Sequence, residues 1–329
     1  MGVLTDSYDR KFNYLRLSVT ETCNYRCVYC LPNGCEKSSY APLSVPEIRN
    51  LVTAFASLGV SKVRITGGEP TAREDIVEIV EAVASVPGIK TTALTTNAYR
   101  LSSLLSALKL AGLNAVNVSV DSLNINRFDE ITGARTDQGR LLKAINGIEH
   151  ALALGISSVK ANVVLLKGMN DAEIPAFFEW AKETPISVRF IELMQTADNS
   201  KLFAQRHLAT STLQKTLLNG GWTPRNRRAG DGPAQVYQRT GYRGTIGLVA
   251  PYSTNFCKSC NRLRVTSTGA LRLCLFGEAD YPLRPLLQHP LQCDELRSTI
   301  NGLLVNKGRT HRLSEGMFGN TRNLAAFGG

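Results

Sequence analysis

Residues 23–30 read CNYRCVYC, so three cysteines lie within eight positions. Soft thiolates of this kind bind iron–sulfur clusters, zinc or cuprous copper. A four-iron cluster ordinarily takes four cysteines, so a set of three leaves one iron open to a substrate. Zinc with Cys35 as a fourth ligand is the alternative, but zinc ligands usually form two separated pairs. The tight spacing, with Tyr29 directly before the last cysteine, therefore favours an iron–sulfur cluster.

The cysteine-rich stretch follows the first of six β-rich runs that alternate with segments of helical spacing. Strands are expected at Tyr14–Val19, Lys62–Ile65, Thr91–Leu94, Ala115–Val120, Val159–Leu166 and Ile186–Leu193, and helices at Pro46–Leu58, Ile76–Val86, Leu101–Ala111, Leu141–Leu154 and Ile174–Ala181. This alternation predicts an α/β fold with a parallel sheet built from βαβ units. Six units, rather than eight, predict a partial (βα)6 TIM-like barrel.

After residue 196 the alternation is lost, and one further helix is expected near Thr210–Leu218. We expect residues 1–220 to form the partial barrel. Residues 221–329 would form a C-terminal domain that carries a second cysteine set and closes the open side of the barrel.

Polar and glycine-rich residues follow most of the expected strands, as in the sequence TGGEP at residues 66–70. Active sites of parallel barrels are built at the carboxyl ends of the strands. Glycines allow the backbone to approach a ligand closely, and the carboxylate of Glu69 can accept hydrogen bonds from an ammonium group. The pattern predicts one site lined by several strands, with the first cysteine set at its rim.

The second cysteine set has the spacing Cys257-x2-Cys260-x13-Cys274. Zinc is a stronger alternative here, with His289 or Cys293 as a fourth ligand. The sequence NRLR follows Cys260, and strand alternation would place its two arginines on one face as a clamp for an anion. A solvated surface pair of arginines is the other interpretation.

Charge and composition limit the classes of function. The formal net charge is +11, from 38 Lys and Arg against 27 Asp and Glu, which favours a nucleic acid, an anionic membrane or a phosphorylated substrate. No apolar run approaches the roughly 20 residues of a membrane helix, and the N-terminus lacks the apolar core of a signal peptide. We therefore expect a cytoplasmic protein whose eight cysteines serve mainly as ligands.

The first cysteine set, with its C-x3-C-x2-C spacing and the aromatic Tyr29, resembles the signature of the radical S-adenosylmethionine superfamily, and residues 67–70 match that group's GGEP motif. The resemblance implies a [4Fe–4S] cluster whose fourth iron binds S-adenosylmethionine, which is then cleaved to a 5′-deoxyadenosyl radical. The implied cluster ligands are Cys23, Cys27 and Cys30, and the implied cofactor contacts are Tyr29, Gly68, Ser119 and Met194.

The stretches FCKSCNRLR at residues 256–264 and LCLF at residues 273–276 resemble the GTP 3′,8-cyclase family of molybdenum-cofactor biosynthesis. The resemblance implies a second [4Fe–4S] cluster, held by Cys257, Cys260 and Cys274, whose open iron contacts guanine. The implied GTP-binding residues are Arg16, Arg64, Thr95, Lys160, Arg262, Leu263 and Arg264, and Lys62 and Arg189 match basic positions of the same pocket.

The same resemblance implies a lyase that cyclises GTP to (8S)-3′,8-cyclo-7,8-dihydroguanosine 5′-triphosphate, the first step of molybdenum-cofactor synthesis. It also implies a homodimer and a downstream cyclic pyranopterin monophosphate synthase. Gly328 and Gly329 fit the family's Gly-Gly terminus, and the resemblance implies that this tail enters the active site. Ala98 stands where the family usually has glycine, so we expect a slightly different turn there. Cys35 and Cys293 are extra and are expected not to be ligands.

Two alternatives remain open at this point. One is a radical enzyme with an auxiliary cluster that modifies a peptide or an RNA, which would share the first cysteine set but not the NRLR match. The other is a zinc-stabilised basic RNA-binding protein, which leaves the strand-end motifs unexplained. We expect GTP as the substrate, with neither a nucleic acid nor a membrane as partner.

Overall fold

The structure is a computed structural model that describes residues 3–34, 40–133, 139–227 and 230–327. Its centre is one sheet in which six consecutive strands lie parallel and side by side. They are β1 (Tyr14–Ser18), β2 (Lys62–Thr66), β3 (Thr91–Thr96), β4 (Ala115–Ser119), β5 (Ser158–Leu165) and β6 (Ser187–Glu192). The predicted partial (βα)6 barrel is confirmed, and each strand lies within one or two residues of its expected bounds.

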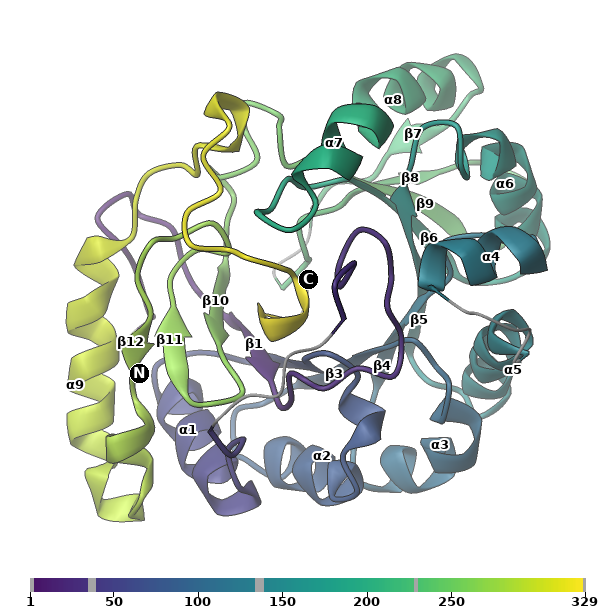
Figure 1. Cartoon of the computed structure of the whole chain (residues 1–329). Helices are drawn as coiled ribbons and strands as arrows, with labels where there is room; N and C mark the ends of the chain where they lie inside the picture. Colours follow the sequence, from purple (N-terminus) through teal and green to yellow (C-terminus); the bar gives the residue numbers. More distant parts are fainter. Residues whose placement is uncertain (1–2, 35–39, 134–138, 228–229, 328–329) are drawn as a thin grey trace.

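Helices cover the outer face of the curved sheet (Figure 1). They are α1 (Val45–Ser57), α2 (Ile76–Ala84), α3 (Leu101–Leu110), α5 (Arg140–Ala153), α6 (Ile174–Glu183) and α8 (Thr210–Asn219). Two more helices, α4 (Ile125–Thr132) and α7 (Ser200–Arg206), follow β4 and β6. The expected helices are all present, whereas α4 and α7 were not predicted. Within the described parts of the chain, no helix combines the length and the apolar character that a bilayer crossing requires.

The C-terminal third adds strands to both edges of the sheet. On one edge, β9 (Thr245–Val249) pairs in parallel with β6 and is followed outward by β8 (Gln235–Gln238) and β7 (Thr223–Pro224). On the other edge, β10 (Arg262–Val265) pairs in parallel with β1.

Beyond β10, β11 (Ala270–Arg272) and β12 (Tyr281–Pro282) continue this edge of the sheet as antiparallel strands. The sheet order is therefore β12-β11-β10-β1-β2-β3-β4-β5-β6-β9-β8-β7 among the described residues. The gap between its two edges is the open side of the barrel.

The last described residues close this open side. Thr321 donates its hydroxyl to Leu275 O at 2.5 Å, just beyond β11, and Asp198 N, after β6, donates to Arg322 O at 3.0 Å. Figure 1 shows the C-terminal segment running into the barrel mouth beside β1. The segment ends in the short 3₁₀ helix η7 (Ala325–Phe327). The predicted closure by the C-terminal extension is thus observed.

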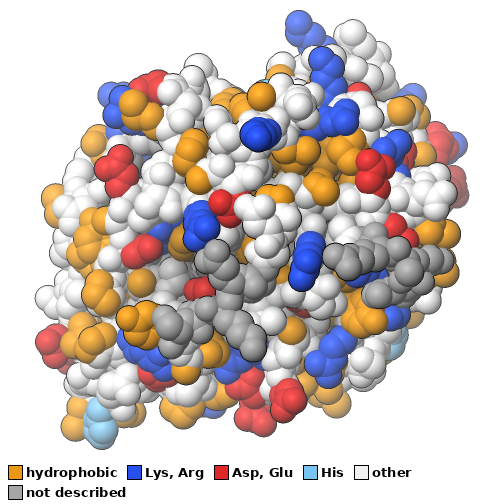
Figure 2. All heavy atoms as spheres, viewed as in Figure 1, with side chains coloured by type: hydrophobic (Ala, Val, Ile, Leu, Met, Phe, Trp, Pro, Cys, Tyr) orange, Lys and Arg blue, Asp and Glu red, His pale blue; other side chains and the backbone are white. Residues whose placement is uncertain are grey.

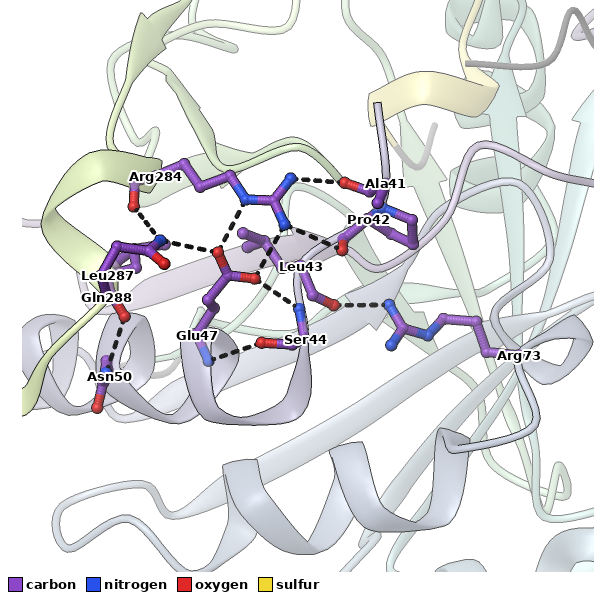
Figure 3. A network of polar contacts seen from close by, with 10 residues as sticks. All are labelled: Ala41, Pro42, Leu43, Ser44, Glu47, Asn50, Arg73, Arg284, Leu287 and Gln288. Atoms are coloured by element: carbon purple, nitrogen blue, oxygen red, sulfur yellow. Dashed lines mark hydrogen bonds and ion pairs between the residues drawn. The ribbon is translucent and has the colours of Figure 1, made fainter. Parts of the chain in front are cut away.

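A polar network holds the C-terminal part against α1 (Figure 3). Glu47 lies in the first turn of α1 and forms a capping box with Ser44. Arg284, from the 3₁₀ helix η3 (Arg284–Leu287), donates to both carboxylate oxygens of Glu47 at 2.8 and 3.1 Å, and Gln288 donates to Oε1 at 2.9 Å. Charge-assisted hydrogen bonds of this kind are stronger than neutral ones, so one carboxylate caps a helix and anchors a distant segment.

Candidate active site

The two cysteine sets, more than 200 residues apart in sequence, line the same cavity inside the barrel. Its walls include Cys23, Cys27, Cys30, Cys257, Cys260 and Cys274. The pairing of β1 with β10 explains this arrangement, because the first cysteine loop follows the end of β1 and Cys260 precedes the start of β10. At about 3.3 Å per residue, four or five strand residues separate the two sets by roughly 15 Å. The sets therefore lie at opposite ends of these strands.

The first cysteine loop rests on the end of α4. Arg26 N donates to Thr132 O at 3.1 Å, and Val28 N donates to Ile131 O at 2.9 Å. Gly133 ends the helix with a φ of 67°, and a Cβ at this position would lie 2.5 Å from Arg26 O. Only glycine satisfies both demands. The helix α4, which was not predicted, therefore supports this loop through backbone hydrogen bonds.

The TGGE turn after β2 packs against the backbone that leads into the cysteine loop. A Cβ at Gly68 would lie 2.3 Å from Thr22 O, so this contact requires glycine. The carboxylate of Glu69 accepts hydrogen bonds from Thr71 and Thr96 on Oε1 and from the Asn97 amide on Oε2, at 2.7 Å. Since a carboxylate oxygen has two lone pairs, Oε2 keeps room for one donor from a ligand. Burial raises the pKa of Glu69, although these hydrogen bonds oppose the rise.

The four residues implied in S-adenosylmethionine binding all line the cavity: Tyr29, Gly68, Ser119 and Met194. Two residues that sequence reasoning missed hold Tyr29 and Met194 in place. Asn199 is buried and donates to both Tyr29 O and Met194 O at 3.0 Å, which joins the cysteine loop to the end of β6. The phenol of Tyr29 donates to Asp121, and burial raises the pKa of this carboxyl to about 6.

The turn after β3 contains Ala98, which has a φ of 62°. This left-handed conformation favours glycine. The turn thus keeps a glycine-like backbone around a buried methyl group.

The second cysteine set is held by backbone contacts and faces basic side chains. His311 N donates a hydrogen bond to Cys257 Sγ at 3.5 Å, and Cys260 N donates one to Cys257 O at 3.1 Å. Burial alone would raise the pKa of Cys260, but the charges of Arg262 and Lys307 lower it to about 7. Lys307 lines the cavity and was not identified from the sequence.

Arg262 and Arg264 lie on the cavity face of β10 with exposed fractions of 5% and 9%, so they are not a solvated surface pair. Leu263 lies between them, and its side chain belongs to the hydrophobic core rather than to the cavity wall. His289 and Cys293 do not line the cavity. Cys35, the remaining candidate ligand, lies outside the described residues.

Among the described residues, no three His, Cys, Asp or Glu side chains are gathered as ligands of a single metal ion. An iron–sulfur cluster makes a different demand on its ligands, because each cysteine binds its own iron.

Positive charge is concentrated inside the cavity. The lining includes Arg16, Arg64, Arg189, Arg262, Arg264 and Lys307. Burial, reinforced by the charges of Arg264 and Arg64, lowers the pKa of Arg16 to about 9. Buried cations are costly unless they are paired with an anion, so this wall suits a polyanionic ligand.

Lys160 lies close to this wall without forming part of it. Burial and the charges of Arg189, Arg64 and Lys62 lower the pKa of Lys160 to about 6. Thr95 does line the cavity and accepts a hydrogen bond from Arg64 Nη1 at 3.0 Å. On the face of the molecule in Figure 2, by contrast, Lys and Arg side chains are scattered among uncharged ones.

Comparisons with known proteins agree with this geometry. A family model described as the Radical SAM superfamily matches residues 17–181, and one described as Molybdenum Cofactor Synthesis C matches residues 186–313. A solved structure of Streptococcus suis SuiB bound to S-adenosylmethionine has a TM-score of 0.61 and covers 92% of this chain and 73% of that chain at 15% identity. This likeness shows a shared fold.

Two curated relatives are similar along the whole chain. The GTP 3′,8-cyclase of Synechococcus elongatus is 50% identical, with 100% of both chains covered. The GTP 3′,8-cyclase of Photorhabdus laumondii is 48% identical, with 99% of both chains covered. With both family models matched in order and this degree of identity, the chain belongs to the GTP 3′,8-cyclase family of the radical S-adenosylmethionine superfamily.

Proposed function

We propose that this chain cyclises GTP to (8S)-3′,8-cyclo-7,8-dihydroguanosine 5′-triphosphate, the first step of molybdenum-cofactor synthesis, with the help of two [4Fe–4S] clusters and S-adenosylmethionine. The observation that carries the proposal is the pair of three-cysteine sets at opposite ends of one basic cavity. One end suits the cofactor, and the other suits the nucleotide.

The residues fit the clusters in their donor chemistry. Cys23, Cys27 and Cys30 would hold the first cluster, and Cys257, Cys260 and Cys274 would hold the second. Each set supplies three thiols to the cavity, which leaves one iron of each cluster free of protein ligands. When bound, the first cluster and S-adenosylmethionine would supply the radical that initiates formation of the bond between C3′ of the ribose and C8 of guanine.

At the first end of the cavity, the protein's own residues bind and orient the cofactor. Tyr29, Ser119 and Met194 surround the space beside the first cysteine loop, and Gly68 brings the turn after β2 against that loop. Oε2 of Glu69 is the carboxylate oxygen that can accept a hydrogen bond from the cofactor's amino group. These contacts are built before the cofactor arrives, which reduces the entropy lost on binding.

At the other end, cations bind GTP. We assign Arg16, Arg64, Lys160, Arg262 and Arg264 to this role, together with Thr95 and the Leu263 segment of β10. Strand register supports the assignment, because Arg16 pairs with both Arg64 and Arg264 in adjacent strands. Arginine forks bind phosphate oxygens in a bidentate manner. A triphosphate would neutralise charges that otherwise repel one another across the cavity.

Several further points belong to the same proposal and rest on the resemblance. We propose a homodimer that passes its product to a cyclic pyranopterin monophosphate synthase and works in the cytoplasm, where thiols stay reduced. We also propose residues 1–220 and 221–329 as the two domains.

The test is an anaerobic assay of reconstituted protein with S-adenosylmethionine, reductant and GTP. The parent protein should contain roughly eight iron atoms per chain in two clusters and consume GTP as it forms 5′-deoxyadenosine. Cys27→Ser should abolish release of 5′-deoxyadenosine, and Cys260→Ser should halve the iron content. Cys293→Ser, which alters a cysteine outside the cavity, is the matched control and should behave as the parent.

Release of 5′-deoxyadenosine without consumption of GTP by the parent would instead favour an enzyme acting on a peptide or an RNA. A parent protein that never carries more than one cluster would contradict the cyclase assignment.

A further inference from the structure

Arg272, at the end of β11, is a fully buried hub of hydrogen bonds, with an exposed fraction of 1%. Its guanidinium forms a bidentate pair with Asp280 at 2.6 and 2.8 Å. The remaining donors reach Leu275 O at 3.3 Å, Thr321 Oγ1 at 3.1 Å and Asn320 Oδ1 at 2.5 Å. Asp280 therefore balances the charge, while the other partners belong to two separate segments.

One of these segments is the turn that carries Cys274. Leu275 follows this cysteine directly, and its carbonyl accepts hydrogen bonds from both Arg272 and Thr321. Gly319 lies so close to this turn that a Cβ would stand 2.5 Å from Gly277 O, and its φ is 60°. The turn and the C-terminal segment are thus packed without any intervening space.

The other segment is the chain that ends in η7. The ring of Phe327 stacks on the guanidinium of Arg272, with 3.6 Å between Cζ and the ring centroid. Just before it, Leu324 and Ala325 line the cavity, whereas neither Arg272 nor Phe327 does. Arg272 therefore acts on the cavity only through the residues that it holds.

We propose that Arg272 is a positioning residue that fixes the C-terminal segment over the cavity and the Cys274 turn below it, with Phe327 as the latch. A planar guanidinium can stack on a ring while its edge donates hydrogen bonds, and an ammonium group cannot. Loss of the stacking frees the segment at the cavity wall but leaves the bonds to Asp280 in place. Loss of the guanidinium of Arg272 loosens both the C-terminal segment and the Cys274 turn.

The consequence for catalysis rests on the proposed function. Leu324 and Ala325 line the cavity, so they would restrict access to it only while the latch holds them in place. With the latch open, more 5′-deoxyadenosine should form per GTP consumed, because the reductant would reach the cavity and supply the quenching hydrogen before the nucleotide reacts.

The decisive test is hydrogen exchange of residues 319–325 in anaerobic, reconstituted protein without GTP. Phe327→Leu should speed exchange of these amides roughly 3- to 30-fold, since a stacked cation–aromatic pair is lost. Phe327→Tyr keeps the ring and should restore parental exchange. Arg272→Lys should speed exchange in the same residues and in residues 274–277 as well.

Arg297→Lys is the matched control, because it makes the same change in an exposed pair with Asp294 on α9 (Cys293–Leu303). It should leave exchange unchanged. Parental exchange in Phe327→Leu would overturn the proposal, and so would faster exchange that Phe327→Tyr fails to restore. This readout needs no GTP turnover, so failure of the cyclase assignment would leave it intact. The ratio of 5′-deoxyadenosine to GTP consumed, measured in the same variants, tests the catalytic consequence separately.

Discussion

The phenol of Tyr29 donates a hydrogen bond to Asp121 Oδ2 across 2.8 Å, which joins the first cysteine loop to the segment that follows β4. Asp121 Oδ1 is held in turn by the Val164 amide at 2.8 Å. The loop is therefore fixed from the side of the strands as well as by Asn199. The side of the cavity that Tyr29 lines is therefore fixed in place before a ligand binds.

Tyr29→Phe should weaken binding of S-adenosylmethionine without removing a cysteine. The variant leaves a buried carboxylate oxygen without its partner, a loss of about 1–3 kcal/mol. Part of this loss should appear as a KM for S-adenosylmethionine that is roughly fivefold higher. Formation of 5′-deoxyadenosine against cofactor concentration measures it. Tyr8→Phe, at an exposed ring, is the control. An unchanged KM in Tyr29→Phe would show that the hydrogen bond does not position the cofactor.

Lys160 should take up a proton when GTP binds. In the free protein the pKa of Lys160 is about 6, so the amine is mostly neutral at pH 7.5. A triphosphate beside it favours the charged form and raises the pKa. The affinity for GTP should therefore fall as pH rises from 6 to 8, by at most about 1.36 kcal/mol per pH unit. Calorimetry in buffers of different ionisation enthalpy measures the proton uptake directly.

Lys160→Met removes this group, so proton uptake at pH 7.5 should decrease by about one proton per GTP. The affinity for GTP at pH 6 should fall roughly 10- to 100-fold. Lys215→Met, at an exposed position of α8, is the matched control and should bind GTP as the parent does. Equal proton uptake by Lys160→Met and the parent would exclude Lys160 from the nucleotide site.

Arg262→Ala should separate cofactor cleavage from nucleotide binding. Arg262 lines the cavity with its side chain almost fully buried, on the strand that begins beside the second cysteine set. Loss of a charged contact should weaken GTP binding by about 1.5–3 kcal/mol. Slow cleavage of S-adenosylmethionine should persist, because the first cysteine set is untouched. Arg49→Ala, on the exposed face of α1, is the control. If Arg262→Ala bound GTP with the affinity of the parent protein, β10 would not be part of the substrate site.

Glu47→Gln should destabilise the fold through the network of Figure 3. The variant breaks the ion pair with Arg284, at a predicted cost of about 1–3 kcal/mol in the free energy of unfolding. Anaerobic urea denaturation at pH 7 measures the difference. Glu130→Gln disrupts an exposed pair with Arg127 and should change stability by less than about 1 kcal/mol. Similar losses in both variants would show that the network is an ordinary surface contact.

The same network should respond to acid. Burial alone would raise the pKa of Glu47, but hydrogen bonds from Arg284, Ser44 and Gln288 lower it from 4.5 to about 2. A lowered pKa means that the stabilisation is complete above pH 4.5 and is lost as pH falls toward 2. The difference in stability between the parent and Glu47→Gln should therefore shrink across this window. If the difference in stability between the parent and Glu47→Gln stayed constant down to pH 2.5, the ionised carboxylate of Glu47 would not be the source of the stabilisation.

The barrel strands could be predicted because their signals are local. Runs such as Lys62–Ile65 are apolar, short and followed by glycine or polar residues, which is the pattern of a buried parallel strand. The helix α4 was missed because only eight residues, with an Asn124 cap, carry it. The places of β9 and β10 could not be predicted, because their pairing partners lie far away in sequence.

The candidate site was predictable to the extent that motifs mark it. The six cysteines of the two sets stand in spaced motifs, and the structure places all of them on one cavity. Asn199 and Arg272 have no such signal, since each acts by joining segments that only the fold brings together. Leu263 was included because of its neighbours, although its side chain faces the core.

The register in which Tyr14 lies beside Arg262, and Arg16 beside Arg264, makes the spacing between Cys260 and β10 intolerant of insertion or deletion. One added residue would exchange the two faces of the strand, so both guanidinium groups would enter the core and Leu263 would face the cavity. Evolution of substrate preference in this fold would therefore have to proceed by replacing side chains in this stretch rather than by altering its length.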